Sequence, residues 1–402
     1  MAQPTLEVAD IFRQYHLQYK QKYKLPFDHL KVISAIINCR TAALGGHIET
    51  CSAGCGYQQI AYNSCRNRHC PKCQFKKARD WMEARESELL PVPYFHVVFT
   101  IPTTQLLPII LPNKKIFYTL MFRCVSETLK TLTLDPKYLG AHTGSICVLH
   151  TWDQQLRLHP HIHCIVPAGG ISPCGTKWIH PKNPNFFAPF SVLADLFRRK
   201  LLAGLKDLNQ KDKLSFLDKD HHLQRSDEFT RFCQPLYIDP WNAFAKPSFN
   251  GPKSVIEYLG KYVHRIAISN WRLLSLENDH VSFTYRDRKN GNTLKDASLH
   301  ALHFMKRFLQ HVLPFQFTKI RAYGLLANRS KKKALAQARA LLCDNSSAEP
   351  IPSVPNPESP SPSTDPSISP LKQCPNCQKG TLISGLSLPP LPSASLCHTR
   401  SP

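Results

Sequence analysis

The segment 157–166 constrains the fold of this chain more than any other, because histidine occupies every second position in its middle. His159, His161 and His163 would share one face of a β-strand, on which side chains two apart point the same way. A single histidine on such a face is usually a core residue, but each imidazole of a row needs its own polar partner. We therefore predict a strand whose His161 and His163 bind a divalent metal, with His159 supporting the site.

Such a site needs a third ligand. Gln154, a few residues upstream, is our candidate, with Asp153 and more distant carboxylates as alternatives that spacing cannot separate. A cation held by two imidazoles and one oxygen keeps positions open for a phosphate oxygen, on which it acts as a Lewis acid. The pattern therefore indicates chemistry at a phosphate group.

A second segment has the capping-box pattern Ser-x-x-Glu at 254–257, which predicts the start of a helix. That helix would carry Tyr258 and Tyr262 one turn apart on one face. A phenol that loses its proton can attack a phosphate and stay bonded to it when a cation is nearby. The alternative is that both tyrosines belong to an apolar helix face. Together with the histidine row, we interpret them as nucleophiles, with Lys261 and Arg265 as DNA contacts.

The charge of the chain indicates the kind of partner it meets. Lys and Arg number 51 against 28 Asp and Glu, which gives a formal net charge of +23. A protein with such an excess of positive charge usually binds a polyanion, most often nucleic acid. Several basic runs of this chain lie beside cysteine or aromatic motifs. The N-terminus has no apolar signal segment and the apolar runs are short. We therefore expect a cytoplasmic protein without a membrane span.

Cysteine is clustered near the N-terminus: the chain has 15, and six of them lie within residues 39–73. Pairs of thiolates a few residues apart suit tetrahedral zinc, and the polar surroundings argue against buried free thiols. We predict a structural Zn²⁺ site, with spare ligands beside it and basic residues that contact DNA phosphates. The predicted ligands are Cys51, Cys55, Cys70 and Cys73; the spare ones are Cys65 and His69, then Cys39 and His47; the DNA contacts are Arg66, Arg68 and Lys72.

The C-terminal part of the chain differs in composition from the rest. Residues 350–370 hold eight prolines mixed with serines, and such a stretch has too little apolar surface to order itself. We predict a disordered linker there. Beyond it, Cys374 and Cys377 form a lone pair with zinc-like spacing, for which Cys397 and His398 are weak candidate partners.

Strand and helix patterns alternate irregularly and hairpin signals occur, which favours an α+β fold with a mainly antiparallel sheet. The predicted strands are 94–101, 146–152, 161–166 and 280–287, the last followed by an Asn-Gly turn, and the predicted helices are 8–15, 27–37, 75–90, 191–208 and 299–312. Three parts follow: a zinc- and DNA-binding domain at 1–92, a catalytic domain at 93–330, and a basic, then Pro/Ser-rich, mostly disordered tail at 331–402.

These motifs, in this order, resemble those of the IS91-family transposases of bacteria, within the wider HUH endonuclease group. The resemblance runs from about residue 27 to about residue 327. It is carried by the motifs at 41–47, 62–73, 151–152, 159–163, 258–269 and 323–327. His161-Ile162-His163 matches the HUH element itself. One departure is the gap of three residues between Cys51 and Cys55, where two are usual.

The resemblance implies an HUH-type central antiparallel sheet flanked by helices, preceded by a small helical, zinc-ribbon-like domain and followed by a disordered tail. It implies Mg²⁺ or Mn²⁺ at the histidines. It also implies single-stranded DNA at element ends and target as substrate, with a 5′-phosphotyrosine intermediate and a free 3′-OH. Tyr258 and Tyr262 are both present, so a two-tyrosine, rolling-circle-like strand transfer is available. We find no Gly-rich helicase loop, so a host helicase or the replication machinery is an expected partner.

Two other functions fit parts of the pattern. A non-catalytic, zinc-dependent DNA-binding protein would use the charge and the cysteines but leave the histidine row idle. A metal-dependent nuclease using activated water would need the histidines, but it would form no covalent link to DNA. We rank both behind a transposase that acts at the nucleoid of the bacterial cytoplasm.

Overall fold

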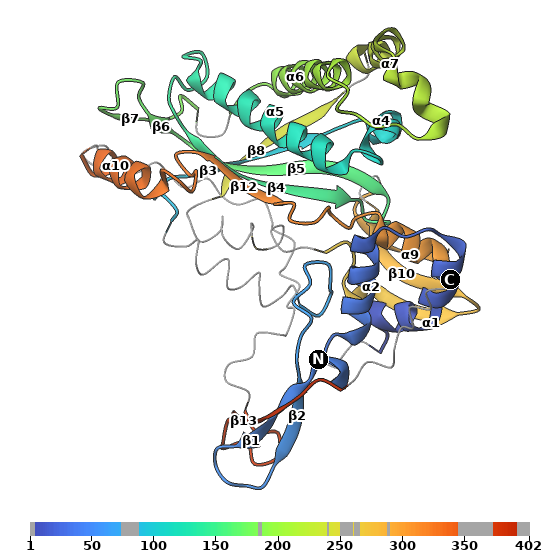
Figure 1. Ribbon diagram of the computed structural model, residues 1–402. Coiled ribbons are helices and arrows are strands. Elements are labelled where there is room, and N and C mark those ends of the chain that lie inside the picture. The colour runs from blue at the N-terminus through green and yellow to red at the C-terminus, as the bar shows by residue number, and fades with distance from the viewer. Residues whose placement is uncertain are drawn as a thin grey trace.

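A five-stranded sheet in the order β12-β4-β5-β3-β8 forms the centre of the molecule (Figure 1). This computed structural model describes residues 5–73, 88–183, 187–238, 241–249, 260, 266–287, 290–344 and 373–391. Every neighbouring pair in the sheet is antiparallel, which confirms the predicted α+β class. The strands are β3 (Tyr94–Thr100), β4 (Gly144–Trp152), β5 (Leu158–Pro167), β8 (Asn242–Phe249) and β12 (Ile320–Gly324).

One face of the central sheet is covered by a layer of helices (Figure 1). Alternate strand residues such as Val97, Leu149 and Ile162 are buried beneath it, because side chains two apart share a face. Phe99 of β3 packs on Phe197, with ring centroids 5.1 Å apart. Each fully buried apolar side chain of this layer contributes about 1.5–3 kcal/mol. The helices are α4 (Thr103–Ile110), α5 (Lys114–Leu134), α6 (Phe190–Gln210) and α7 (Ser226–Ile238).

The opposite face of the sheet carries the histidine row and a smaller apolar cluster. Val148, which pairs with His163, belongs to this cluster. Leu335 and Ala338 of α10 (Lys331–Asp344) are buried in the same cluster. The first part of the predicted tail therefore forms a helix that packs against this side of the sheet. The histidines lie on the side that α4 to α7 leave uncovered.

A second core joins two parts of the chain that are far apart in sequence. Helices α1 (Val8–Lys22) and α2 (Phe27–Asn38) pack there with α9 (Ala301–Leu309), and a three-stranded sheet completes it. Phe12 meets Phe308 edge to face at 5.3 Å, and the Tyr15 hydroxyl donates to Asp279 at 2.7 Å. The helices of the predicted first domain thus share their core with residues 267–312. The sheet strands are β9 (Leu273–Glu277), β10 (His280–Asp287) and β11 (Thr293–His300).

A narrow three-stranded ribbon projects away from both cores (Figure 1). It consists of β1 (Gly46–Cys51), β2 (Gln58–Tyr62) and β13 (Leu382–Leu388), in the order β13-β1-β2. Both pairings are antiparallel. A C-terminal strand therefore completes a sheet that begins near the N-terminus.

Most predicted elements are confirmed by the described residues. Strands β3, β4, β5 and β10 and helices α1, α2, α6 and α9 overlap the predicted ranges, and β10 and β11 form the predicted hairpin. The predicted helix 75–90 falls largely on 74–87, which lie outside the described residues. No helix of the described ranges is long and apolar enough to cross a bilayer. The remaining short elements are β6 (Gly170–Ile171), β7 (Trp178–Ile179), η1 (Ala42–Leu44), η2 (Asp218–Gln224) and η3 (Asn270–Arg272).

Candidate active site and metal centres

Three histidines from two neighbouring strands converge on the face of the sheet opposite α4 to α7. His150 of β4 lies directly opposite His161 of β5, and His163 follows two residues along the same face. The ring centroids are 5.4 Å apart for His150 and His161, 4.7 Å for His150 and His163, and 4.9 Å for His161 and His163. A ring nitrogen of each lies within 4.8 Å of those of the other two. Three imidazole nitrogens facing a common point are a suitable ligand set for one divalent cation.

Neighbouring groups orient two of these imidazoles. Nδ1 of His161 lies 2.7 Å from the main-chain carbonyl oxygen of His159, which can only accept a hydrogen bond. Nδ1 therefore carries the proton, and Nε2 carries the lone pair that a metal needs. Nδ1 of His163 lies 2.9 Å from Nε2 of His96, a buried residue of β3. Partners of this kind on the second ring nitrogen are usual for histidines that bind metals.

His150 was missed in the sequence because it stands alone in its strand. Only the pairing of β4 with β5 brings it opposite His161. Gln154 lies in the turn between β4 and β5, where its main-chain carbonyl accepts a hydrogen bond from Arg272. The structure thus offers His150 for the third position, and a ligand role for Gln154 stays a prediction. The His159 ring lies 5.2 Å from that of His161.

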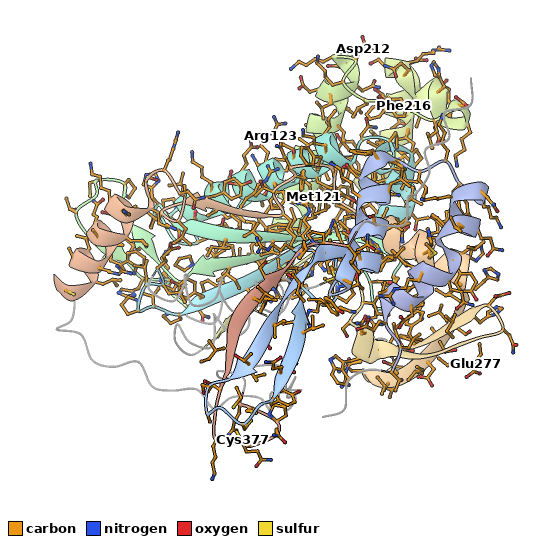
Figure 2. The ribbon with its side chains drawn as sticks, turned by 60° about the horizontal axis from the view of Figure 1, so that its bottom comes forward. Met121, Arg123, Asp212, Phe216, Glu277 and Cys377 are labelled. Atoms are coloured by element: carbon orange, nitrogen blue, oxygen red, sulfur yellow. The ribbon has the colours of Figure 1, made fainter. Side chains whose placement is uncertain are left out.

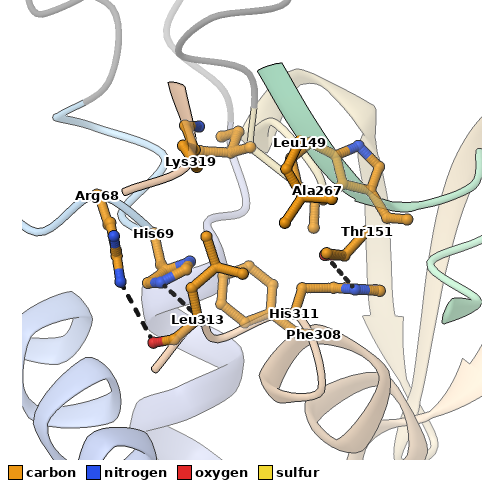
Figure 3. Close-up of a pocket in the computed structure, with 11 residues that line it drawn as sticks. Arg68, His69, Leu149, Thr151, Ala267, Phe308, His311, Leu313 and Lys319 are labelled. Atoms are coloured by element: carbon orange, nitrogen blue, oxygen red, sulfur yellow. Dashed lines mark hydrogen bonds between the residues drawn. The ribbon is translucent and has the colours of Figure 1, made fainter. Parts of the chain in front are cut away.

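Trp152, which contacts one of the site histidines, also lines a small pocket, shown in Figure 3 with the residues labelled there. Trp152 stacks on His150, with ring centroids 4.9 Å apart and 19° between the planes. Thr151, His311 and Lys319 line the pocket with it. Burial lowers the pKa of His311 to about 3 and the pKa of Lys319 to about 8. Burial disfavours a lone cation here, and a bound anion such as a phosphate would raise both values again.

The predicted nucleophiles, Tyr258 and Tyr262, lie outside the described residues, as do Lys261 and Arg265. The chain resumes at Ile266, which lines the same pocket as Trp152. The described chain that follows the tyrosine segment therefore begins at this pocket.

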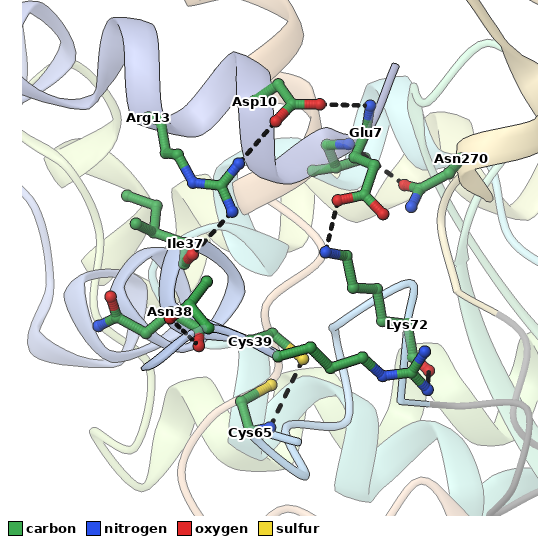
Figure 4. A network of polar contacts seen from close by, with 12 residues as sticks. Glu7, Asp10, Arg13, Ile37, Asn38, Cys39, Cys65, Lys72 and Asn270 are labelled. Atoms are coloured by element: carbon green, nitrogen blue, oxygen red, sulfur yellow. Dashed lines mark hydrogen bonds and ion pairs between the residues drawn. The ribbon is translucent and has the colours of Figure 1, made fainter. Parts of the chain in front are cut away.

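Four cysteines form a compact group where α2 ends, and two of them, Cys39 and Cys65, are seen in Figure 4. Cys39 caps α2, and its sulfur lies 3.5 Å from that of Cys73, which in turn lies 3.6 Å from that of Cys65. Cys70 is the fourth member. A tetrahedral zinc with Zn–S bonds of about 2.3 Å places its sulfurs about 3.8 Å apart. The group therefore fits a structural zinc bound by four thiolates.

The predicted zinc ligand set needs correction, because the structure separates its two pairs. Cys70 and Cys73 belong to the group at Cys39, whereas Cys51 and Cys55 lie with Cys377 at the far end of the ribbon, where Figure 2 labels Cys377. Strand β1, with six residues at about 3.3 Å each, carries the chain away from the first group. Cys65 and Cys39, which were predicted only as spare ligands, complete the group with Cys70 and Cys73 in place of Cys51 and Cys55.

Comparison with known proteins finds family profiles over both the histidine site and the cysteine group at Cys39. The sequence profile of the family described as "Putative transposase" matches residues 144–334, and that of the family described as "Transposase zinc-binding domain" matches residues 11–101. "Putative transposase y4qJ" of Sinorhizobium fredii is 44% identical over 389 residues, covering 96% of each chain. The chain belongs to the IS91-type transposase family.

A second relative of this transposase is more distant. The "Transposase for insertion sequence element IS801" of Pseudomonas savastanoi pv. phaseolicola is 29% identical over 306 residues, which are 75% of this chain and 70% of the relative. No solved structure matches the chain significantly. The first profile spans His150, His161 and His163, and the second spans the group of four cysteines at Cys39.

Two residues of the transposase's zinc loop, residues 65–73, turn inward (Figure 3). Arg68 donates to the main-chain carbonyls of Leu313 at 3.3 Å and Pro314 at 2.9 Å, and also to that of Phe317. His69 accepts from the Leu313 N–H at 3.4 Å, and burial holds its pKa well below the usual range. These contacts tie the loop to the segment after α9. His69 is therefore a structural residue outside the four-sulfur group, and Arg68 would have to break these bonds to reach DNA.

The other predicted DNA contacts differ in their surroundings. Lys72 forms an ion pair with Glu7 at 2.5 Å, which ties the zinc loop to the start of α1 (Figure 4). Arg66 is exposed. Among the predicted contacts in the described part of the zinc loop, Arg66 is therefore the one that lies at the surface of the transposase.

Proposed function

We propose that this transposase cuts and rejoins single-stranded DNA at the ends of its element through a 5′-phosphotyrosine intermediate. The observation that carries this proposal is the convergence of His150, His161 and His163 on the face of the central sheet opposite α4 to α7. A packed core has no need of three imidazoles with converging nitrogens, whereas a metal-assisted reaction at a phosphate does. Transposases act on DNA, which makes a DNA phosphate the expected target.

The three imidazoles would hold one divalent cation, with His96 and His159 fixing the orientation of two of them. When bound, the cation would polarise a phosphate oxygen as a Lewis acid. Mg²⁺ prefers oxygen ligands in strict octahedral geometry, whereas imidazole suits transition metals. Of the two predicted ions, we therefore propose Mn²⁺ as the one that this nitrogen-rich site binds more tightly.

Tyr258 or Tyr262 would supply the nucleophile. Its phenolic oxygen would bond to phosphorus as the bond from phosphorus to the 3′ oxygen breaks. The phenolic proton would pass to solvent, and the departing oxygen would take up a proton to become the free 3′-OH. Strand transfer reverses these steps with a new 3′-OH as the attacking group.

Chain connectivity supports an approach of the tyrosine to the histidines. Tyr262 precedes Ile266 by four positions, and four residues span at most about 14 Å. Ile266 lines the pocket with Trp152, whose ring stacks on His150. This short connection supports the proposal that a tyrosine of this segment acts at the metal, with the other available for a second step.

The basic charge of the transposase supports binding of a nucleic-acid backbone. With a net charge of +23, the chain would release counterions from DNA on binding, so its affinity should fall steeply with salt. We propose the single-stranded element ends and the target strand as its DNA. We also propose that a host helicase or the replication machinery opens the duplex.

The decisive experiment detects the covalent adduct. Purified transposase is incubated with Mn²⁺ and an element-end oligonucleotide labelled at its 3′ end, the side that stays attached to tyrosine. A labelled protein band on a denaturing gel is expected, and it should be absent from the double variant Tyr258→Phe/Tyr262→Phe. Tyr285→Phe, in strand β10, is the matched control and should form the adduct normally. An adduct that persists in the double variant would refute the tyrosine assignment.

The same gel separates the alternative functions. A metal-dependent nuclease would release fragments with a free 5′-phosphate and leave the protein unlabelled. This is the second candidate, because the histidine site alone would support it. A non-catalytic DNA-binding protein would shift the oligonucleotide on a native gel and cleave nothing with any metal.

A further inference from the structure

Four cysteines from distant parts of the chain meet at the tip of the ribbon, where Figure 2 labels Cys377. Cys51 ends β1, Cys55 follows it, and Cys374 and Cys377 precede β13. The sulfurs of Cys51 and Cys377 are 3.6 Å apart although 326 positions separate them in sequence. Those of Cys55 and Cys374 are also 3.6 Å apart, across 319 positions. All four sulfurs lie within 4.8 Å of one another.

These separations fit a bound metal and do not fit disulfides. Four sulfurs around a zinc with bonds of about 2.3 Å lie about 3.8 Å apart. A disulfide would bring two of them to about 2.05 Å. In the group at Cys39 the sulfurs of Cys39 and Cys73 lie 3.5 Å apart and those of Cys65 and Cys73 lie 3.6 Å apart, which is the same spacing.

The surroundings of the four sulfurs also suit thiolates. The main-chain N–H of Gly380 donates to the Cys377 sulfur at 3.5 Å, and the Asn376 amide donates to the Cys55 sulfur at 3.7 Å. Such donors favour the charged form of the sulfur. A β-carbon on Gly380 would lie 2.6 Å from the Cys51 sulfur, so a glycine is needed for the C-terminal turn to approach this closely.

We propose that Cys51, Cys55, Cys374 and Cys377 bind a second structural zinc, which anchors residues 373–391 to the N-terminal ribbon. Four thiolates leave no open position, so this zinc would not take part in chemistry. The two family profiles end at residues 101 and 334, so neither includes the C-terminal half of this site. The lone C-terminal cysteine pair finds its partners in the ribbon. Its candidate partners in the sequence, Cys397 and His398, lie outside the described residues.

The anchor explains how the ribbon keeps its third strand. β13 pairs with β1 from Gly46 opposite Leu388 to Cys51 opposite Leu382, and the main-chain N–H of Ser52 donates to the Thr381 carbonyl at 2.8 Å. A two-stranded hairpin is only marginally stable in water, and an added strand also covers one of its open edges. The zinc would hold β13 in place against the entropy of the long intervening chain.

Metal content of the full chain tests this proposal. Wild-type protein should contain two zinc ions per chain, measured by mass spectrometry of the metal. Cys374→Ser/Cys377→Ser and Cys51→Ser/Cys55→Ser should each contain one, and so should the variant with all four changes, because all four act on one site. Cys174→Ser/Cys343→Ser, at two exposed cysteines, should retain two. Two zinc ions in the Cys374→Ser/Cys377→Ser variant, or one in the wild type, would overturn the proposal.

A second measurement does not depend on how well a variant folds. A site for a specific protease is placed within residues 353–366, and the cut protein is passed over a sizing column. The C-terminal fragment should remain bound in zinc and separate after chelation, and in Cys51→Ser/Cys55→Ser it should separate at once. Release in the presence of zinc, or thiols found oxidised in the wild type under denaturing conditions, would contradict the proposal. This test requires no DNA cleavage, so its outcome is independent of the proposed tyrosine chemistry.

Discussion

Nε2 of His96 lies 2.9 Å from Nδ1 of His163, and the planes of the two rings differ by only 8°. His96 is only 2% exposed, and Phe244 packs edge to face on its ring at 5.9 Å. If His163 binds a metal through Nε2, its Nδ1 must donate to His96, so His96 fixes both the tautomer and the ring orientation. It is a positioning residue, since it acts through His163.

His96→Phe should weaken metal binding without unfolding the sheet, because an aromatic ring is kept while the hydrogen bond to His163 is lost. We expect the Mn²⁺ concentration for half-maximal adduct formation to rise about 10–100-fold. Saturating Mn²⁺ should restore most of the rate. A titration of adduct formation against Mn²⁺ measures this. A lower maximal rate with an unchanged Mn²⁺ requirement would mean that His96 does not act through the metal.

His150→Ala and Gln154→Ala distinguish the two candidates for the third ligand. Loss of His150 removes one of three converging nitrogens, so we expect adduct formation to fall at least about 100-fold. Gln154→Ala should change adduct formation by less than about threefold if the Gln154 side chain does not bind the metal. Mn²⁺ binding, measured directly by electron spin resonance, should also be weakened more by His150→Ala than by Gln154→Ala. If Gln154→Ala lowered adduct formation and Mn²⁺ binding more than His150→Ala did, Gln154 would be the third ligand.

Arg68 and Arg66 should affect different properties. Arg68→Ala leaves three main-chain carbonyls without their charged donor, so the free energy of unfolding should fall by at least about 2 kcal/mol. Arg66→Ala, at the surface, should change stability by less than about 0.5 kcal/mol. It should instead lower DNA affinity and reduce the slope of log affinity against log salt by about one. Denaturant unfolding and a salt series of DNA binding measure the two effects.

Acid should destabilise the protein partly through His311. Burial lowers its pKa to about 3 in the fold, whereas the unfolded chain has the ordinary value of about 6.5. Above pH 6.5 His311 is neutral in both states, and its protonation costs no stability. As the pH falls from 6.5 toward 3, the unfolded chain binds a proton that buried His311 does not, so the free energy of unfolding decreases. The loss is up to about 1.4 kcal/mol per pH unit.

The variant His311→Gln removes this proton uptake while keeping polar atoms near Thr151 and Leu156. Denaturant unfolding at pH 7.5, 6 and 5 should show a shallower decline in stability than for the wild type. His221→Gln, at an exposed position, is the control and should leave the decline unchanged. Parallel curves for His311→Gln and the wild type would contradict this prediction.

Cys39→Ser should cost one zinc ion and much of the stability of the zinc loop, because Cys39 closes the group with Cys65, Cys70 and Cys73. Cys124→Ser, at a buried cysteine in α5 outside the cysteine groups found in the described residues, should keep the full zinc content. Metal analysis and thermal unfolding compare the two variants. If Cys39→Ser kept the full zinc content, Cys39 would not be a zinc ligand, and another residue would supply the fourth one.

The sequence alone was sufficient for features with a local pattern. Alternation over 161–166 predicted a strand with two histidines on one face, and the 3.6-residue period over 191–208 predicted α6. The resemblance in the cysteine and histidine motifs indicated the transposase family. Each of these depends on residues close together in the chain, where the periods of strand and helix are fixed by backbone geometry.

Pairings across the chain were decided only by the tertiary structure. His150 reaches His161 through the register of β4 against β5, and Cys55 reaches Cys374 across 319 positions. Arg68 looked like a phosphate contact in sequence but turns toward the carbonyls after α9. No local period encodes such contacts, because they depend on strand register and on closing long loops. The sequence therefore determined which residues could do chemistry, and packing decided which of them meet.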